Sequence, residues 1–191
     1  MSTDQLTIPA GITADEWMFD VIRPFIKGRT LEIGSGNDVI ISSFLKNNLP
    51  IHLSDTDWEG CEVLIQKYEG NSLVRSIHKV DLHRSDFFSA YSDRIGIFET
   101  VFKLNSSKQI PIDERAIANA NLLLKQGGHL IVLLPAYTAV YTGMEEDPKA
   151  IKRHNRQFVR SLLGQSFEVQ QTQYCNLPGT GLSVIVIASK R

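Results

Sequence analysis

The sequence has few cysteines and no excess of charge of either sign. Its two cysteines, Cys61 and Cys175, stand far apart, form no CxxC pair and have no cluster of histidines nearby. This argues against a zinc site or a disulfide scaffold and predicts reduced thiols in the core. With 20 basic and 21 acidic residues in 191, the chain has no global field that would recruit nucleic acid or anionic lipid. We expect small or only locally charged partners and no metal.

Long hydrophobic runs are also missing. No stretch of 18 uninterrupted apolar residues occurs, and the first residues, Met1 to Gln5, show neither a basic start nor an apolar stretch of signal-peptide length. We therefore expect a soluble, cytoplasmic protein without membrane insertion. There are no internal repeats or linkers, so residues 1–191 form a single domain in the simplest interpretation. The sequence does not fix the oligomeric state.

The most informative stretch is a short apolar segment that runs into glycines. Residues 29–33 predict a buried strand, with Glu32 two places before the turn Gly34-Ser35-Gly36, and residues 39–45 predict a helix. Glycines at such a junction let the backbone approach a ligand closely and point free N–H groups at it. We expect a cofactor here. Asp38 stands near the place of the third glycine of the dinucleotide fingerprint, so that fingerprint is incomplete.

A helix over residues 13–27 is predicted to lead into this strand, after a flexible N-terminus at residues 1–12. Thr13 and Glu16 have the spacing of a capping box, and apolar residues then recur at helical spacing. Pro24 should kink the last turn. Trp17 on this helix has two possible roles, packing in the core or contact with a ligand.

The second predicted strand, residues 49–57, ends in acid. Asp55 lies nineteen residues beyond Gly36, where a carboxylate can accept hydrogen bonds from both ribose hydroxyls of an adenosine. Alternatively, Asp55 could cap the helix that begins near Asp57 and Trp58. Together with the glycine turn, the spacing favours ribose, with Thr56 next to it.

Further strands and helices alternate along the rest of the chain. Strands are predicted at 73–80, with Asp81 and Leu82 at the tip, at 98–105, and at the apolar run 130–134. A helix is predicted from Pro111 through Leu124, ended by residues 125–128. After a helix at 158–163, strands 167–175 and 182–188 are joined so closely that they must be antiparallel. The fold class is therefore α/β, a doubly wound, mostly parallel sheet of seven strands.

Residues 136–156 depart from this alternation. They are rich in tyrosine, then in acid, then in base, and they follow the carboxyl end of the fifth strand. They are therefore expected to lie over the crevice at that edge of the sheet. Two interpretations remain open, a solvated charged face and a lid over the substrate.

These motifs together resemble the class I methyltransferases that use S-adenosylmethionine. Residues 31–36, Leu-Glu-Ile-Gly-Ser-Gly, resemble their first motif, and Asp55 and Asp81 match their acidic second and third strand tips. Residues 123–128, Leu-Leu-Lys-Gln-Gly-Gly, resemble their entry to strand five. The likeness runs from about Trp17 to the end and implies a Rossmann-like fold. Residues 16–25 are similar to members from surface-polysaccharide and small-metabolite pathways.

The resemblance implies S-adenosylmethionine as the cofactor and a small-molecule or sugar-type methyl acceptor. It assigns the methionine end to Glu32 and the turn from Gly34 to Gly36, the ribose to Asp55, and the adenine to Asp81 with Leu82. Leu104 and Asn105 would border the methyl group. Candidates on the substrate side are His154 as a general base and, for substrate binding, Trp17, Tyr137, Tyr141 and Arg153.

Two departures from the family keep other functions open. Ser107, Lys108, Gln109 and Ile110 stand where members often have Leu-Glu-His-Ile, and the basic stretch before the last helix is only faintly echoed near His154. His154 could therefore be a solvated surface residue. The chain could also be a binding module that keeps the fold without catalysis. A nicotinamide-dependent oxidoreductase is disfavoured by Asp38 and by the final antiparallel strands.

Overall fold

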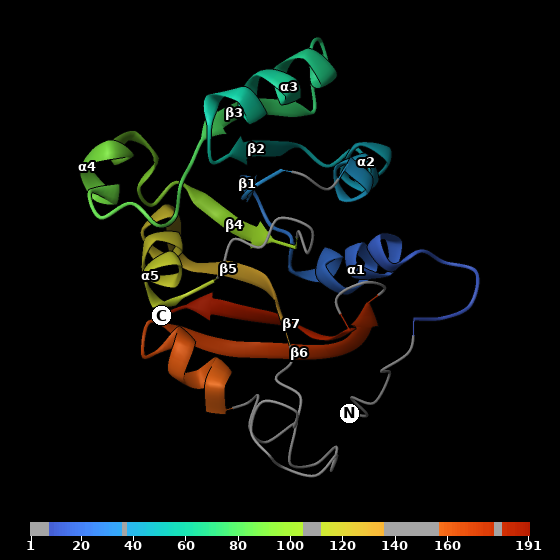
Figure 1. Cartoon of the computed structure of the whole chain (residues 1–191), viewed down its shortest axis with the longest axis vertical. Helices are drawn as coiled ribbons and strands as arrows, with labels where there is room; N and C mark the ends of the chain where they lie inside the picture. The colour runs from blue at the N-terminus through green and yellow to red at the C-terminus, as the bar shows by residue number, and fades with distance from the viewer. Residues whose placement is uncertain (1–7, 36–37, 105–111, 136–156, 178–180) are drawn as a thin grey trace.

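The computed structural model describes residues 8–35, 38–104, 112–135, 157–177 and 181–191. Figure 1 shows a central twisted sheet with helices on both faces. The strand order is β3-β2-β1-β4-β5-β7-β6. Neighbours from β3 to β5 are parallel, whereas β7 runs antiparallel to both β5 and β6. The seven-stranded, mostly parallel sheet with an antiparallel C-terminal pair is thus confirmed. The strands are β1 (Thr30–Glu32), β2 (Ile51–Asp55), β3 (Val74–Lys79), β4 (Phe98–Lys103), β5 (Leu124–Pro135), β6 (Phe167–Leu177) and β7 (Gly181–Lys190).

The helices cover the two faces of this sheet. One face carries α5 and the helical residues 157–163, and the other carries α1 and α2 (Figure 1). No helix within the described ranges combines the length and the apolar composition that a bilayer span requires. The helices are α1 (Ala14–Ile22), η1 (Arg23–Phe25), α2 (Asp38–Lys46), α3 (Trp58–Tyr68), α4 (Phe87–Ala90), η2 (Ser92–Arg94) and α5 (Glu114–Leu123).

The leading helix begins as predicted and ends earlier. The Glu16 amide donates to Thr13 Oγ1 at 3.2 Å and the Thr13 amide donates to Glu16 Oε2 at 2.9 Å, which completes the capping box. The α-helix stops at Ile22 rather than at residue 27, and the chain continues as the single 3₁₀ turn η1. Pro24 lies within that turn because its ring cannot continue an α-helical hydrogen-bond ladder.

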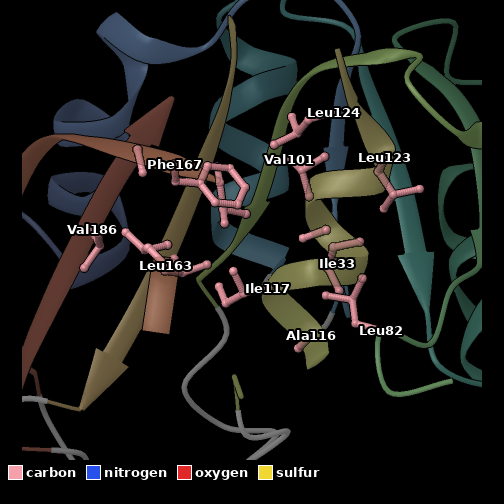
Figure 2. Packing of buried hydrophobic residues seen from close by; sticks show 14 of the residues in the cluster. Ile33, Leu82, Val101, Ala116, Ile117, Leu123, Leu124, Leu163, Phe167 and Val186 are labelled. Atoms are coloured by element: carbon pink, nitrogen blue, oxygen red, sulfur yellow. The ribbon is translucent and has the colours of Figure 1, made fainter. Parts of the chain in front are cut away.

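Side chains that alternate along the strands build a core on each face. Leu31, Val101 and Val132 belong to the core under α5, which Figure 2 shows from close by. Phe102 and Ile131, one residue away, belong to the core under α1 and α2. A strand buried on both faces is apolar at nearly every position, which is the pattern that predicted the fifth strand.

The start of β5 differs from the prediction. The sequence assigned residues 125–128 to the end of a helix and began the strand at Leu130, but β5 begins at Leu124, which pairs with Phe98. The next pair is Thr100 with His129, so the residues between them form an irregular bulge in the ladder. Gly127 has a φ of +72°, a conformation that glycine adopts without strain. The glycines therefore shape a bulge within the strand.

Four polar side chains form a hydrogen-bonded chain that links η2, β3 and β2. Arg94 Nε donates to His78 Nδ1 at 3.3 Å, so the other ring nitrogen of neutral His78 carries the proton. That nitrogen donates to Ser76 Oγ at 2.6 Å, and the Ser76 hydroxyl donates to His52 Nδ1 at 2.6 Å. Burial lowers the pKa of His52 to about 4, helped by the positive charge of Arg29. The chain is therefore built for neutral imidazoles.

Candidate functional site at the carboxyl ends of β1 to β4

Four adjacent parallel strands, β3, β2, β1 and β4, end at one edge of the sheet. In open α/β sheets, ligands bind in the crevice outside this edge. Most of the residues that the sequence singled out for the cofactor lie there: Glu32 at the end of β1 with Gly34 and Ser35 after it, Asp55 at the end of β2 with Thr56 after it, Asp81 and Leu82 after β3, and Leu104 after β4. The fold thus brings together residues from four separate segments of the chain.

The turn after β1 is held against β2 by reciprocal hydrogen bonds. The Ser35 amide donates to the Ser54 carbonyl at 2.6 Å, and the Ser54 amide donates to Ser35 Oγ at 3.0 Å. The Ser54 hydroxyl donates to the Glu32 carbonyl at 2.7 Å. Gly34, between them, has a φ of +70°, which an L side chain rarely adopts. The backbone of the turn is therefore fixed in place, and Ser54, which the sequence did not single out, does much of the fixing.

Asp55, the last residue of β2, and Asp57, two residues later, have separate roles. Asp57 Oδ1 accepts from the Gly60 amide at 2.7 Å and caps α3. Asp55 is only 2% exposed, and its Oδ1 accepts from the Thr56 amide at 2.7 Å. Capping of α3, the alternative open for Asp55, is thus performed by Asp57. The Asp55 carboxylate is instead oriented by its own turn at the edge of the sheet.

Gly60 in the first turn of α3 lies directly against the Asp55 carboxylate. A Cβ atom placed on Gly60 would be 2.3 Å from Asp55 Cγ, far inside van der Waals contact. Only glycine therefore lets α3 pack this close to Asp55. Cys61, the next residue, is free and buried, and burial raises the pKa of its thiol. The same holds for Cys175, whose pKa burial raises to about 11, so both are core thiols as predicted.

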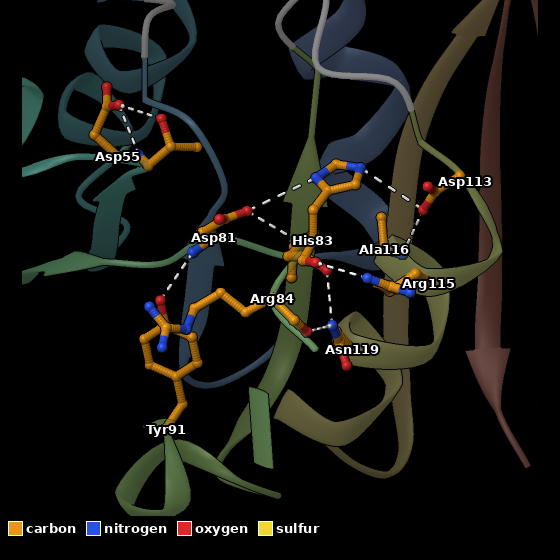
Figure 3. Close-up of polar contacts among 11 residues, drawn as sticks. Asp55, Asp81, His83, Arg84, Tyr91, Asp113, Arg115, Ala116 and Asn119 are labelled. Atoms are coloured by element: carbon orange, nitrogen blue, oxygen red, sulfur yellow. Dashed lines mark hydrogen bonds and ion pairs between the residues drawn. The ribbon is translucent and has the colours of Figure 1, made fainter. Parts of the chain in front are cut away.

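The loop after β3 is a network of polar contacts around Asp81 (Figure 3). The His83 amide donates to Asp81 Oδ1 at 2.9 Å, and the Asp81 amide donates to the Tyr91 hydroxyl at 3.1 Å. The His83 imidazole lies between two carboxylates, 3.7 Å from Asp81 Oδ1 and 3.6 Å from Asp113 Oδ1. These contacts set the direction of the Asp81 carboxylate.

Helix α5 fastens the same loop from the other side. The buried Asn119 amide donates to the carbonyls of Leu82 at 2.7 Å and Arg84 at 3.0 Å. Asp113 caps α5 by accepting from the Ala116 amide at 2.8 Å, as the acids at the predicted helix start suggested. Sequence reasoning missed Asn119, because a polar residue within an amphipathic helix looks the same whether it faces water or a loop.

The side chains of two adjacent residues at the end of β4 are buried. Leu104 is buried, and Lys103 is only 5% exposed. A Cβ atom placed on Gly34 would lie 3.6 Å from Lys103 Nζ, so the lysine reaches across to the turn after β1. Sequence reasoning missed Lys103, since a single lysine before a polar loop is typical of a solvated strand end.

Several of the predicted site residues lie outside the described residues: Gly36, Asn105, Tyr137, Tyr141, Arg153 and His154. The candidate lid at 136–156 lies outside them as well, so these assignments stay predictions. Trp17 is buried in the core under α1 and α2, the packing role that was one of its two possibilities. Among the described residues, no group of three or more His, Cys, Asp or Glu side chains is arranged to hold a metal ion.

Comparisons with known proteins agree on the fold. No family model matches the sequence, and no curated protein matches it either. Among solved structures, the chain is similar to geranyl diphosphate C-methyltransferase from Streptomyces coelicolor A3(2), solved with S-adenosyl-L-homocysteine, at 9% identity and a TM-score of 0.62, covering 92% of this chain and 76% of that one.

Two further structures show the same likeness. The N-methyltransferase NodS from Bradyrhizobium japonicum WM9 is 14% identical with a TM-score of 0.57, over 88% of this chain and 89% of that one. A SAM-dependent methyltransferase from Methanosarcina mazei is 15% identical with a TM-score of 0.60, over 89% and 96% of the two chains. The chain therefore has the fold of the class I, S-adenosylmethionine-dependent methyltransferases.

Proposed function

We propose that the chain is an S-adenosylmethionine-dependent methyltransferase that acts on a small-molecule or sugar-type acceptor. One observation carries the proposal: an acid or a glycine turn stands at the end of each of three neighbouring strands, and each is held by hydrogen bonds to its surroundings. S-adenosylmethionine supplies a methyl group on a sulfonium, which a nucleophilic atom of the acceptor attacks in line.

The residues at these strand ends fit the parts of that cofactor. Asp55, oriented by Thr56, would accept hydrogen bonds from the two ribose hydroxyls. Asp81 with Leu82 would border the adenine, with the carboxylate turned by the His83 amide. Glu32 and the fixed turn at Gly34 would hold the methionine end, because a glycine, which has no side chain, leaves room for a ligand to approach the backbone closely.

Methyl transfer needs no covalent intermediate with the protein. Alignment of the nucleophile with the methyl group supplies most of the acceleration, and a base is needed only where the nucleophile must lose a proton. In this proposal Leu104, buried at the end of β4, and Asn105 border the methyl group. His154 is the candidate base, and Tyr137, Tyr141 and Arg153, from the segment 136–156, are the candidate acceptor contacts, whereas Trp17 packs in the core. A geranyl diphosphate C-methyltransferase among the similar structures supports a small acceptor.

Calorimetric titration of the purified protein tests the cofactor. We expect saturable binding of S-adenosylmethionine and S-adenosylhomocysteine, and none of NAD. Asp55→Asn should weaken both by roughly 10- to 100-fold, because a charged acceptor of two hydrogen bonds becomes neutral. Asp20→Asn, which removes an exposed carboxylate on α1, is the matched control and should bind as the wild type does. Binding that Asp55→Asn leaves intact would contradict the assignment.

A cofactor-binding module without catalysis is the second candidate function. Its support is the polar stretch Ser107-Lys108-Gln109, which replaces the acid and histidine that the resemblance leads one to expect. One similar structure, the cyclase SpnF, with 14% identity and a TM-score of 0.66 over 96% of this chain and 84% of that one, is named for a reaction other than methylation. Release of S-adenosylhomocysteine from S-adenosylmethionine in the presence of panels of small acceptors separates the two functions. Binding without any turnover would favour the module.

A further inference from the structure

Lys103 is a buried cation at the candidate cofactor site. It is the last residue of β4 and is 5% exposed. Lysine is almost never fully buried unless it is paired, because removing an ammonium group from water costs several kcal/mol. A buried lysine at the carboxyl end of a central strand therefore places a positive charge where this fold binds ligands.

The side chain of Lys103 is packed under α5, and its ammonium group lies at the turn after β1. With Ile33, Ala116 and Ile117, Lys103 lines a small cavity of about 10 Å³ under α5. Such a cavity has room for about one water at most, so the stem has little freedom to move. The head lies at the turn after β1, since a Cβ atom placed on Gly34 would be 3.6 Å from Lys103 Nζ. The packing thus fixes the ammonium beside the glycine turn.

An opposite charge stands on the neighbouring strand. Glu32 is 1% exposed and is paired in register with Phe102, the residue before Lys103. A buried carboxylate and a buried ammonium therefore end two adjacent parallel strands. This pair of charges is complementary to a zwitterionic amino acid, which presents one ammonium group and one carboxylate.

We propose that Lys103 binds the carboxylate of the methionine end of S-adenosylmethionine, with Glu32 serving the amino group. The inference rests on the proposed function and deepens it, because it makes the site selective for an adenosine ligand that carries an intact amino acid. Ligands that share the adenosine but lack the carboxylate lose the contact with Lys103. A charged hydrogen bond to Lys103 is stronger than one at the surface, because Lys103 and Glu32 are both buried.

The test is a calorimetric comparison of three ligands: S-adenosylmethionine, its decarboxylated form, and 5′-methylthioadenosine. The wild type should bind S-adenosylmethionine roughly 10- to 100-fold more tightly than the decarboxylated form. Lys103→Met should remove most of this preference by weakening S-adenosylmethionine alone, and Lys103→Arg should keep part of it. Lys46→Met, which removes an exposed lysine of α2, should keep all of it.

The outcomes separate failure of this inference from failure of the proposed function. Equal affinity of the wild type for S-adenosylmethionine and its decarboxylated form would overturn the role of Lys103, even if Lys103→Met does not fold. If Lys103→Met lowers the affinity for S-adenosylmethionine and for its decarboxylated form equally, the inference is also overturned, since the lysine would then support the site without binding the carboxylate. If the wild type binds none of the three ligands, the proposed function fails together with the inference. If it binds 5′-methylthioadenosine, the protein has an adenosine site, and only the role of Lys103 is in question.

Discussion

Replacing Gly60 by alanine should disturb the cofactor site from outside it. The added Cβ would lie 2.3 Å from Asp55 Cγ, and normal contact needs roughly 3.5 Å, so the carboxylate must move by about 1 Å. Asp55 is buried, and its carboxylate accepts a hydrogen bond from the Thr56 amide at 2.7 Å, so this movement disrupts that hydrogen bond. The substitution therefore acts on the ribose-binding carboxylate without touching the ligand itself.

Two effects on stability oppose each other in this variant. Alanine is favoured over glycine within a helix by about 1 kcal/mol, whereas crowding in a packed region costs about 1–3 kcal/mol. We expect Gly60→Ala to lose no more than about 2 kcal/mol in free energy of unfolding. Binding should suffer more, because displacement of a charged acceptor costs about 1.5–3 kcal/mol, or roughly 10- to 100-fold in affinity for S-adenosylmethionine.

Urea unfolding and calorimetric titration on the same preparation measure both quantities. The matched control is Gly70→Ala at the other end of α3, where a Cβ would meet nothing within 4 Å and the φ is +74°. That variant should lose about 1 kcal/mol of stability through backbone strain and keep its affinity. If Gly60→Ala binds S-adenosylmethionine as tightly as Gly70→Ala does, the link between α3 and the Asp55 carboxylate is refuted.

Three further predictions concern stability. The pKa of His52 is about 4 in the folded protein and about 6.5 in the unfolded chain, so the unfolded state takes up the proton first as the pH falls. The free energy of unfolding should therefore fall by up to about 3 kcal/mol between pH 6.5 and pH 4. In urea unfolding, His52→Gln should flatten this pH dependence. Asp113→Ala removes the cap of α5 and should cost about 1 kcal/mol in thermal unfolding, whereas Asp93→Ala, which breaks only an exposed ion pair, should cost less than about 0.5 kcal/mol. Phe44→Ala removes a ring stacked 5.3 Å from Phe102 and should cost about 3–5 kcal/mol; a loss below about 1 kcal/mol would show that the core under α2 is not packed as described.

The fold could be predicted because its signals are local. The apolar run 130–134, the alternation of strands with helices, and the short connection near residues 178–181 each follow from the pattern of a few neighbouring residues. The start of β5 could not be predicted, because Leu124 is extended only through its pairing with Phe98. A glycine pair after a helix is typical of a helix end, and tertiary pairing decided otherwise here.

The residues expected to contact the cofactor were predicted from their spacing in the sequence, but the residues that hold them in place were not. Asp55 and Asp81 could be singled out because strand ends are visible in the sequence. Contacts between segments far apart in the chain leave no such pattern, and Gly60, Ser54 and Lys103 act through them. A glycine in the first turn of a helix and a lysine at the end of a strand are both frequent in proteins without any functional site, so neither indicates one in the sequence.

The central claim is that the carboxyl ends of β1 to β4 hold S-adenosylmethionine, and amide NMR tests it most directly. Titration with S-adenosylhomocysteine should shift the amide signals of Gly34, Ser35, Thr56 and Leu82, because these residues lie at the strand ends, and should leave those of α3 and β3 near residues 68–76 unchanged. Saturable shifts confined to the first group would support the account. Shifts confined to residues 68–76, or no shifts at all, would contradict it.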